Sequence, residues 1–291
     1  MKLPLLGCCA LLPFANAAQT LERIEKSGSF TIVHRESSVP FSYLLPNQAE
    51  PVGLAVELCK RVAEAVQREL KLKSLKIRYL PVTSSTRIPA IVEGKADIEC
   101  GTTTDNKERR EQVSFSHHHF FGAIQILART STGIQSWSDL DGRRVVFSKG
   151  TSTQGVLAKD ARTASLSYTT LEAKDHAESF EWLSAGKADA FVLEDVQLAG
   201  MRASAAKPAD FALVGQRLTI EPYALMMAKG DVRFQRLVNR ELEQIYRSGE
   251  YAKLYKRWFE SPIPPKQINF DLPMSNLLRG QVRRPSSILP G

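Results

Sequence analysis

The sequence predicts an α/β protein made of two similar halves, each a mainly parallel sheet flanked by helices. Short runs rich in β-forming residues alternate with stretches whose apolar residues recur at helical spacing. The tetrapeptide Gly-Lys-Ala-Asp also occurs twice, at 94–97 and 186–189, each time between a helical segment and an apolar strand. Alternating strands and helices supply the crossovers that parallel strands need, so both halves are expected to contain such a sheet.

In the first half, a strand at 30–33 precedes a helix that begins after Gly53. Its apolar residues share one helical face: Leu54, Leu58, Val62, Val66 and Leu70. A strand at 76–82, a helix at 84–92 and a strand at 97–100 follow, and the second helix begins among hydroxyl residues typical of N-caps. The glycine of Gly-Lys-Ala-Asp suits the left-handed conformation that ends a helix.

The second half repeats this order after the apolar region 120–127. Its predicted elements are a strand at 144–147, a helix at 151–159, a strand at 167–170, a helix at 176–184 and a strand at 190–193. The chain then continues with a strand at 223–227 and helices at 232–248 and 251–258. The prolines of 262–265 stop regular structure, and residues 271–291 are expected to form a loose tail.

Composition limits the classes of function. The 291 residues are 43% hydrophobic and 24% charged, as expected for a globular protein with one large or two modest cores. The formal charge of +8 comes from basic residues scattered among acidic ones, without the aromatic-interleaved basic stripe of nucleic-acid-binding proteins. Beyond the N-terminal region, no segment has the roughly 18 consecutive apolar residues of a membrane helix. We therefore expect neither nucleic-acid binding nor a membrane span.

Residues 1–17 have the features of a signal peptide. Lys2 precedes an apolar stretch at 3–14 that is too short to span a bilayer, and Ala-Asn-Ala at 15–17 is a small-x-small cleavage site. Acylation of Cys8 as a lipoprotein is the alternative, but the apolar stretch before Cys8 is too short for it. We expect export into the periplasm, with a mature chain that begins near Ala18.

Two cysteines, Cys59 and Cys100, remain after the signal peptide. An oxidising compartment permits a bond between them, but each lies in an apolar pattern in which buried free thiols are common. Free thiols are the expectation, and a disulfide is the alternative.

Cations and hydroxyls follow three of the strand-like regions of the first half. These segments are HRESS at 34–38, SSTR at 84–87 and GTTT at 101–104. The carboxyl ends of parallel strands meet at one edge of a sheet, so the three segments should lie close together. Arginine donates two parallel hydrogen bonds to a carboxylate, and each bond to a charged group contributes ~1.5–3 kcal/mol. The segments therefore predict a site for an acidic small molecule, anchored by Arg35 and Arg87.

The second half offers fewer candidates for this site. Ser152 lies in a Gly-Thr-Ser-Thr segment that opens a helix, where hydroxyls and amides can face an anion or simply cap the helix. His176 begins a helix and could donate to a carboxylate, most strongly when protonated, and Asp195 follows a strand and could accept from an ammonium group. Histidines 117–119 are expected to form a polar loop, because adjacent side chains diverge and do not share one metal ion. No metal or cofactor is expected.

Several motifs together resemble one family. They are HRESSVPFSY at 34–43, TSSTRIP at 83–89, ECGTTT at 99–104, AKDH at 173–176 and SPIPPK at 261–266. The chain resembles, from about residue 20 to 266, the periplasmic glutamate/aspartate-binding proteins of ABC importers, within bacterial solute-binding protein family 3. The resemblance implies a two-lobed clamshell with a two-strand hinge. Lobe 1 would comprise residues 18–122 and 219–270, and lobe 2 residues 123–218.

The resemblance also implies a role for each candidate residue. The ligand α-carboxylate would be held by Arg87, Thr102 and Thr104. The side-chain carboxylate would be held by Arg35, Ser84 and His176. Asp195 would accept from the ammonium group, and Ser152 would add a hydroxyl from lobe 2. The implied protein is a monomeric receptor without catalytic activity, and its partners are glutamate or aspartate and the permease subunits of the inner membrane.

Two other functions are compatible with these residues. An exported lyase or dehydratase acting on a small carboxylate could use the same architecture, with His176, Glu36 or Glu194 as the acid or base. The second alternative is a sensor domain that reports its ligand to a signalling partner, although the chain contains no output domain. A purified receptor would bind acidic amino acids without converting them, whereas the enzyme would form a product. Neighbouring genes that encode a permease and an ATPase would separate the receptor from the sensor.

Overall fold

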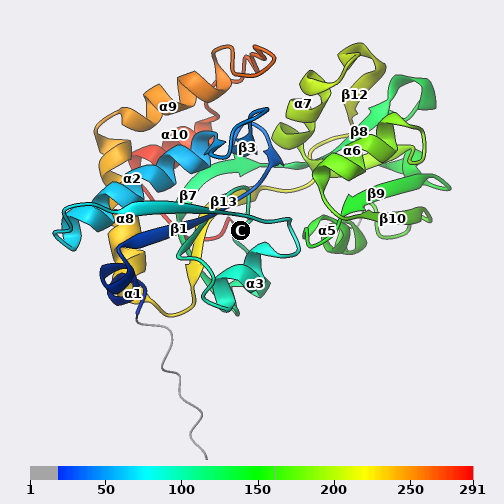
Figure 1. The fold of residues 1–291 in the computed structure, drawn as a ribbon. Helices are drawn as coiled ribbons and strands as arrows, with labels where there is room; N and C mark the ends of the chain where they lie inside the picture. Colours follow the sequence, from blue (N-terminus) through cyan, green and yellow to red (C-terminus); the bar gives the residue numbers. More distant parts are fainter. Residues whose placement is uncertain (1–18, 161, 291) are drawn as a thin grey trace, which may run out of the picture.

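The structure, a computed structural model, describes residues 19–160 and 162–290, so the predicted signal peptide lies outside the described residues. Two five-stranded sheets form two lobes that lie side by side (Figure 1). Helices cover both faces of each sheet. This arrangement confirms the predicted two-lobed α/β class.

The sheet of the first lobe has the order β5-β1-β6-β13-β7. Its strands are β1 (Ser29–His34), β5 (Lys76–Pro81), β6 (Ile98–Cys100), β7 (Val113–Gly122) and β13 (Glu221–Ala228). Strands β5, β1 and β6 are parallel, whereas β13 is antiparallel to β6 and β7. A small second sheet consists of β2 (Ser37–Ser38), β3 (Ser42–Leu44) and β4 (Pro51–Val52).

Helices cover the two faces of this sheet unequally. The larger core lies under α1 (Thr20–Ser27), α2 (Leu54–Glu69), α8 (Val232–Arg247) and α9 (Glu250–Phe259). A smaller core on the other face lies under α3 (Arg87–Val92). The short helix α4 (Lys107–Arg110) packs near β7. The apolar face predicted for residues 54–70 is the buried face of α2.

The second lobe has the strand order β10-β9-β11-β8-β12. Its strands are β8 (Ile124–Arg129), β9 (Arg144–Ser148), β10 (Thr169–Ala173), β11 (Ala190–Glu194) and β12 (Phe211–Val214). One face packs against α5 (Thr153–Lys159) and the 3₁₀ helix Trp137–Leu140, and the other against α6 (His176–Ser184) and α7 (Asp195–Ser204). The chain passes between the two sheets twice, from β7 to β8 and from β12 to β13.

The two Gly-Lys-Ala-Asp segments have the conformation that the sequence predicts. Gly94 follows α3 with φ of 68°, and Gly186 follows α6 with φ of 76°. Both values are left-handed, which a residue with a Cβ rarely adopts. The predicted helix at 84–92 is shorter in the structure, because residues 84–86 form a turn and α3 begins at Arg87.

Histidines 117–119 do not form the polar loop predicted from the sequence, because they lie within β7. His118 and His119 are buried in the first lobe, whereas His117 is half-buried and contacts Glu243. Burial, reinforced by neighbouring His118, lowers the pKa of His119 to about 3, so its ring is neutral at physiological pH. Among residues 19–160 and 162–290, no group of three or more histidine, cysteine, aspartate or glutamate residues is arranged to hold a metal ion.

The C-terminal segment also differs from the loose tail that the sequence predicts. Residues Asn276–Arg283 form α10, in which Leu278 is buried and Gln281 donates from Nε2 to the His118 carbonyl at 3.1 Å. The His118 amide donates in turn to the Ser286 carbonyl at 3.1 Å. Because β7 is the edge strand of its sheet, its outward backbone groups need partners, and the tail supplies them.

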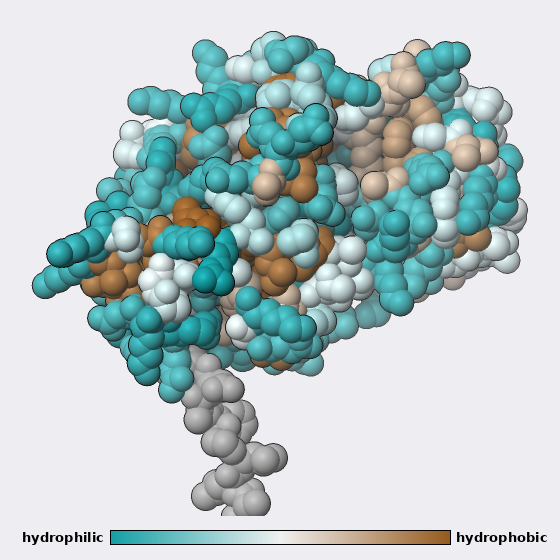
Figure 2. All heavy atoms as spheres, viewed as in Figure 1, coloured by the Kyte–Doolittle hydropathy of each residue, from teal (hydrophilic) through white to brown (hydrophobic). Residues whose placement is uncertain are grey.

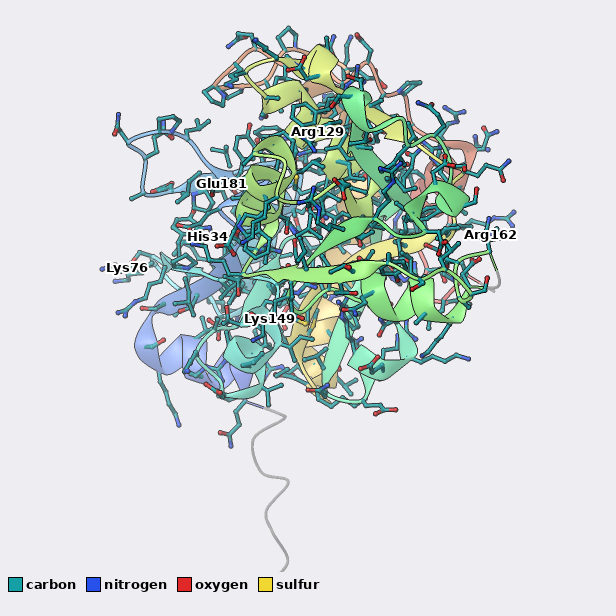
Figure 3. All side chains as sticks on the ribbon, turned by 90° about the vertical axis from the view of Figure 1, so that its right-hand side faces the viewer. His34, Lys76, Arg129, Lys149, Arg162 and Glu181 are labelled. Carbon is teal, nitrogen blue, oxygen red and sulfur yellow. A yellow bond between two sulfur atoms is a disulfide. The ribbon has the colours of Figure 1, made fainter. Side chains whose placement is uncertain are left out.

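The surface is dominated by polar and charged residues. On the face shown in Figure 2, hydrophilic residues cover most of both lobes and hydrophobic ones form limited patches. Figure 3 views the molecule from the side of the second lobe, where the labelled cations Arg129, Lys149 and Arg162 lie apart from one another. Within the described part of the chain, no helix is long and apolar enough to cross a membrane.

A disulfide joins Cys59 of α2 to Cys100 of β6, so the expectation of free thiols is wrong. Both side chains are buried, as expected, but the packing of α2 on the sheet brings their Cα atoms to 6.3 Å. The sequence alone shows that both cysteines lie in apolar patterns, but it does not show how α2 and β6 are aligned against each other. The bond closes a loop of 41 residues and restricts the unfolded chain.

Replacing both cysteines by serine is expected to lower the free energy of unfolding by about 2–4 kcal/mol. Urea denaturation of the two proteins would measure this difference. A reducing agent should shift the midpoint of the wild-type protein and leave that of the double variant unchanged. A difference below about 0.5 kcal/mol would show that the bond does not stabilise the fold.

Candidate ligand-binding site

The predicted cations and hydroxyls converge at one edge of the first lobe. Strands β5, β1 and β6 are parallel, so their carboxyl ends lie at the same edge, followed by the segment 82–86, Arg35 and the segment 101–104. In the second lobe, the carboxyl ends of β9, β10 and β11 likewise share one edge. The two edges face each other, because Thr102 Oγ1 donates to Oε1 of Gln197, a residue of α7, at 3.3 Å.

Arg35 is a buried cation with some of its donors already engaged. Its side chain is 1% exposed, and it donates from Nε to the Val82 carbonyl at 3.1 Å and from Nη1 to Ser84 Oγ at 2.8 Å. Burial, reinforced by the like charge of Arg87, lowers its pKa to about 10. Arg35 and Ser84 therefore form one polar unit, as the sequence predicted from their positions after neighbouring strands.

Arg87 is buried with fewer partners. It is 2% exposed at the start of α3, and its Nε has no hydrogen-bond partner among the described residues. Burial lowers the pKa of its guanidinium, while the carboxylates of Glu99 and Glu194 act in the opposite direction. A buried donor without a partner is costly, so the Arg87 guanidinium is suited to receive a ligand carboxylate.

Thr102 and Thr104 lie beside the arginines. Both are almost fully buried, and Thr104 forms a β-bridge with Tyr223 of β13. The backbone carbonyl of Thr104 accepts a hydrogen bond of 2.8 Å from Nη1 of Arg109. Thr102 contacts the second lobe through Gln197, so this segment connects the two edges of the site.

His176 begins α6, as predicted, and is buried. It is 1% exposed, and burial together with the positive charge of Arg35 lowers its pKa well below the usual value. Its ring is therefore neutral, so the expected gain from protonation does not apply.

The hydroxyl chain behind His176 determines which ring nitrogen carries the proton. Ser179 Oγ donates to the Asp175 carbonyl at 2.8 Å, so Ser148 Oγ must donate to Ser179 Oγ, also at 2.8 Å. The 2.8 Å contact between His176 Nδ1 and Ser148 Oγ is then a donation from Nδ1. This assignment leaves Nε2 as an acceptor, and a ligand carboxylate would require the chain of hydroxyls to reverse.

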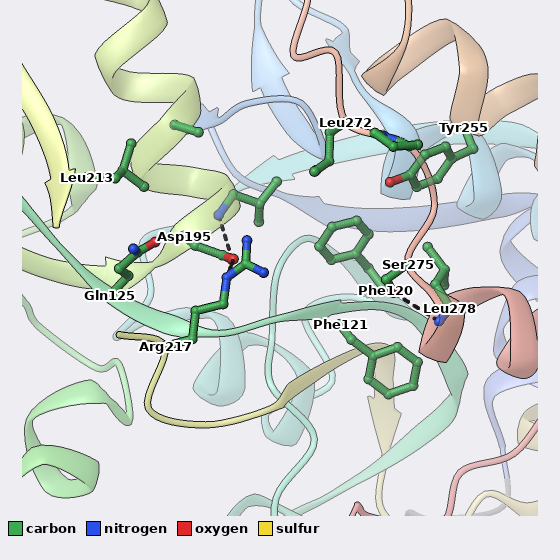
Figure 4. A pocket seen from close by; sticks show the side chains of 13 residues that line it. Phe120, Phe121, Gln125, Asp195, Leu213, Arg217, Tyr255, Leu272, Ser275 and Leu278 are labelled. Carbon is green, nitrogen blue, oxygen red and sulfur yellow. Dashed lines mark hydrogen bonds and ion pairs between the residues drawn. The ribbon is translucent and has the colours of Figure 1, made fainter. Parts of the chain in front are cut away.

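Asp195 lies apart from the arginines. Its Oδ1 accepts from the backbone amides of Ala123 at 3.1 Å and Val196 at 2.8 Å, and its Oδ2 accepts from Arg217 Nε at 2.8 Å. Figure 4 shows this pair at the rim of a pocket lined by Phe120 and other apolar residues. Three donors therefore already occupy the Asp195 carboxylate.

The preceding residue, Glu194, faces the cluster instead. It is buried at the end of β11 and accepts from Gln197 Nε2 at 3.0 Å. Burial, reinforced by the nearby Glu221 carboxylate, raises its pKa to about 7. The sequence placed both acids at the end of the strand, but its pattern did not indicate which one points inward.

Ser152 is half-buried at the beginning of α5. Its side chain makes no capping hydrogen bond, and it lines a groove between the lobes together with Thr104. The structure thus places it at the margin of the cluster. Its hydroxyl remains free to contact a ligand or water.

A third buried arginine was not predicted. Arg109 of α4 is 7% exposed, and burial together with Arg87 lowers its pKa to about 10. No strand-like run precedes Arg109 in the sequence, so its place in the site could not be predicted from the ends of strands. The only signal in the sequence is its position three residues after Asn106, the N-cap of α4.

The charges of the cluster nearly balance. Three guanidinium groups face three buried carboxylates: Arg35, Arg87 and Arg109, with Glu99, Glu194 and Glu221. Burial raises the pKa of Glu99 and of Glu221. Such a cluster offers an opposite charge to each charged group of a small molecule that carries both carboxylates and a cation.

The sequence profile of the bacterial extracellular solute-binding proteins, family 3, matches residues 30–261. The L-glutamate/L-aspartate-binding protein of Pseudomonas aeruginosa is 40% identical over 267 residues, which cover 92% of this chain and 88% of that protein. The glutamate/aspartate import solute-binding protein of Escherichia coli is 36% identical over 270 residues, which cover 93% of this chain and 89% of that protein.

Solved structures share the same fold. An ancestral amino acid-binding protein, AncCDT-1, a precursor of cyclohexadienyl dehydratase, matches with a TM-score of 0.69 at 29% identity, covering 82% of this chain and 99% of that one. A mutant of ArgBP from T. maritima matches with a TM-score of 0.71 at 25% identity, covering 83% of this chain and 99% of that one. The profile match and the two sequence relatives each span most of the chain, which therefore belongs to the bacterial extracellular solute-binding proteins of family 3.

Proposed function

We propose that this protein is a periplasmic receptor that captures glutamate or aspartate and delivers it to the permease subunits of an ABC importer. The observation that carries the proposal is the pair of buried guanidinium groups, Arg35 and Arg87, behind the hydroxyls of one sheet edge. The names of the Pseudomonas aeruginosa and Escherichia coli relatives support the same ligands. The receptor would act as a monomer, without a cofactor, after cleavage of its signal peptide.

Each ligand group has a proposed partner. Arg87, Thr102 and Thr104 would hold the α-carboxylate. Arg35 and Ser84 would hold the side-chain carboxylate, joined by His176 once its hydroxyl chain reverses. For the ammonium group, Glu194 replaces Asp195, because the Asp195 carboxylate is bound to Arg217 and to two backbone amides.

Ligand capture would be coupled to closure of the lobes. Arg87 and Arg35 belong to the first lobe, whereas His176 and Glu194 belong to the second. A ligand that contacts both lobes binds the closed state more tightly than the open state, and this difference in affinity drives closure. Permease subunits that recognise the closed form would then receive only loaded receptors.

Calorimetric titration with glutamate, aspartate, glutamine and asparagine tests the proposal. The two dicarboxylates are expected to bind, and the amides to bind more weakly by ~3–5 kcal/mol, because an uncharged amide leaves the Arg35 guanidinium buried without an anion. Incubation with the same amino acids should leave them unchanged. Equal affinities for glutamine and glutamate, or the formation of a product, would overturn the proposal.

The ionisation of Glu194 makes a prediction about pH. Its pKa is about 7 where the two lobes meet, and an ammonium partner would lower it, so the ligand binds preferentially to the ionised form. Affinity is therefore expected to rise by up to about tenfold per pH unit below pH 7 and to level off above it. Calorimetry at pH 6 in two buffers of different ionisation enthalpy should detect proton release on binding.

The Glu194→Gln variant is the control for this pH dependence. It should bind more weakly than the wild-type protein at pH 8, and its affinity should change little between pH 6 and pH 8. A wild-type affinity that is constant over the same range would exclude Glu194 as the partner of the ammonium group.

A further inference from the structure

The lobes touch through a turn that only glycine can form. Gly150 follows β9 of the second lobe and has φ of +79°. A Cβ atom at this position would lie 2.5 Å from Ser85 Cα, 2.6 Å from Ser85 N and 2.7 Å from Ser84 C, all backbone atoms of the first lobe. Because backbone cannot swing aside as the end of a side chain can, the absence of a Cβ is what permits this approach.

The same turn accepts a hydrogen bond from the third buried arginine. Arg109 donates from Nη1 to the Thr104 carbonyl at 2.8 Å and from Nη2 to the Gly150 carbonyl at 3.4 Å. One guanidinium therefore joins the backbone of a proposed ligand-binding residue in the first lobe to the backbone of the second lobe. Its position is fixed by Asn106, whose side chain accepts from the Arg109 amide at 2.8 Å.

We propose that Arg109 and Gly150 form an interlobe latch that holds the receptor in its closed state, a role that rests on the proposed function. The hydrogen bond from Arg109 to the Gly150 carbonyl and the approach of Gly150 to Ser84 and Ser85 both cross from one lobe to the other, so they exist only when the lobes are together. Arg109 also holds the Thr104 carbonyl, so the latch positions the segment that would contact the ligand. Arg109 acts in this scheme as a positioning residue that does not touch the ligand.

A latch that forms after capture should affect the two rate constants differently. Ligand meets the first lobe before closure, so loss of the latch is expected to leave the association rate nearly unchanged and to accelerate dissociation. Residues that merely stabilise the first lobe would not produce this separation. Stopped-flow tryptophan fluorescence with glutamate would measure both rates.

The decisive comparison uses two glycines with the same backbone conformation. Gly150→Ala introduces the clash with Ser84 and Ser85, whereas Gly142→Ala places alanine at φ of +70° with no neighbouring atom within 4 Å. Both variants carry the strain of a left-handed alanine, so thermal unfolding should change equally. Gly150→Ala is expected to weaken glutamate binding by more than about tenfold and to prevent the decrease in radius of gyration on ligand binding, measured by X-ray scattering, that Gly142→Ala retains.

Arg109→Lys keeps the charge but cannot reach both carbonyls, and it should raise the dissociation rate without changing the association rate. Wild-type-like affinity and compaction in Gly150→Ala would overturn the latch and leave the proposed function intact. If the wild-type protein binds a different amino acid, the proposed function is wrong, and the same comparison of Gly150→Ala with Gly142→Ala, made with that amino acid, tests the latch. If no amino acid compacts the wild-type protein, both proposals fall.

Discussion

Replacing Arg87 by glutamine is expected to weaken glutamate binding by about 100- to 1,000-fold. The guanidinium can donate two parallel hydrogen bonds to a carboxylate, each contributing ~1.5–3 kcal/mol, and its Nε has no partner among the described residues. The substitution should therefore weaken the complex with glutamate without destabilising the receptor itself. Calorimetry with glutamate and aspartate measures this change, and both ligands should be affected because both carry an α-carboxylate.

The fold of the Arg87→Gln variant should remain intact. Burial lowers the pKa of Arg87, which means that folding disfavours its charged form, so removal of the charge is not expected to destabilise the ligand-free protein. Arg236→Gln on the exposed face of α8 is the matched control and should bind as the wild-type protein does. An affinity of Arg87→Gln within about threefold of wild type would remove Arg87 from the site.

Replacing Arg35 by glutamine is expected to abolish the preference for glutamate over glutamine. The wild-type preference of ~3–5 kcal/mol arises because the amide leaves a buried guanidinium unpaired. Once the guanidinium is absent, glutamate should lose most of its affinity and glutamine should lose little. Parallel titrations of the two amino acids measure the ratio, and a ratio that stays at the wild-type value would assign the selectivity to another residue.

The same variant is expected to raise the thermal stability of the ligand-free protein. Burial lowers the pKa of Arg35 to about 10, so its charged form is less stable in the folded chain than in the unfolded chain. This cost is fully present below pH 10 and is lost as the pH rises above about 10. Arg35→Gln should therefore increase the Tm at pH 7 by about 2–5 °C, since Val82 and Ser84 lose a donor and offset part of the gain. A lower Tm would show that these hydrogen bonds outweigh the burial cost.

Much of the site follows from local patterns. Parallel strands end at one edge of a sheet, so a cation after 30–33 and a cation after 76–82 must approach each other once the alternation of strands and helices is recognised. The burial of Arg35 and Arg87 agrees with this expectation. The glycines that end α3 and α6 were predictable for a similar reason, because each depends on the backbone conformation of a single residue.

The structure differs from the sequence-based expectations at residues whose contacts lie far away in the sequence. Glu194 and Asp195 are adjacent, and the packing of β11 and α7 against the first lobe decides that Glu194 faces the arginines while Asp195 binds Arg217. Arg109 follows no strand, and its importance arises from the contact with Gly150, 41 residues away.

The local sequence of this protein was sufficient to predict most strands of the two large sheets, the helices α2, α6, α8 and α9, and the two arginines at the strand ends, because those features depend on neighbouring residues. The pairing of Cys59 with Cys100, the attachment of the C-terminal helix to β7 and the choice of the inward-facing acid emerged only with the assembled fold. Each of these depends on the relative position of two packed elements, which no local pattern of apolar or polar residues encodes.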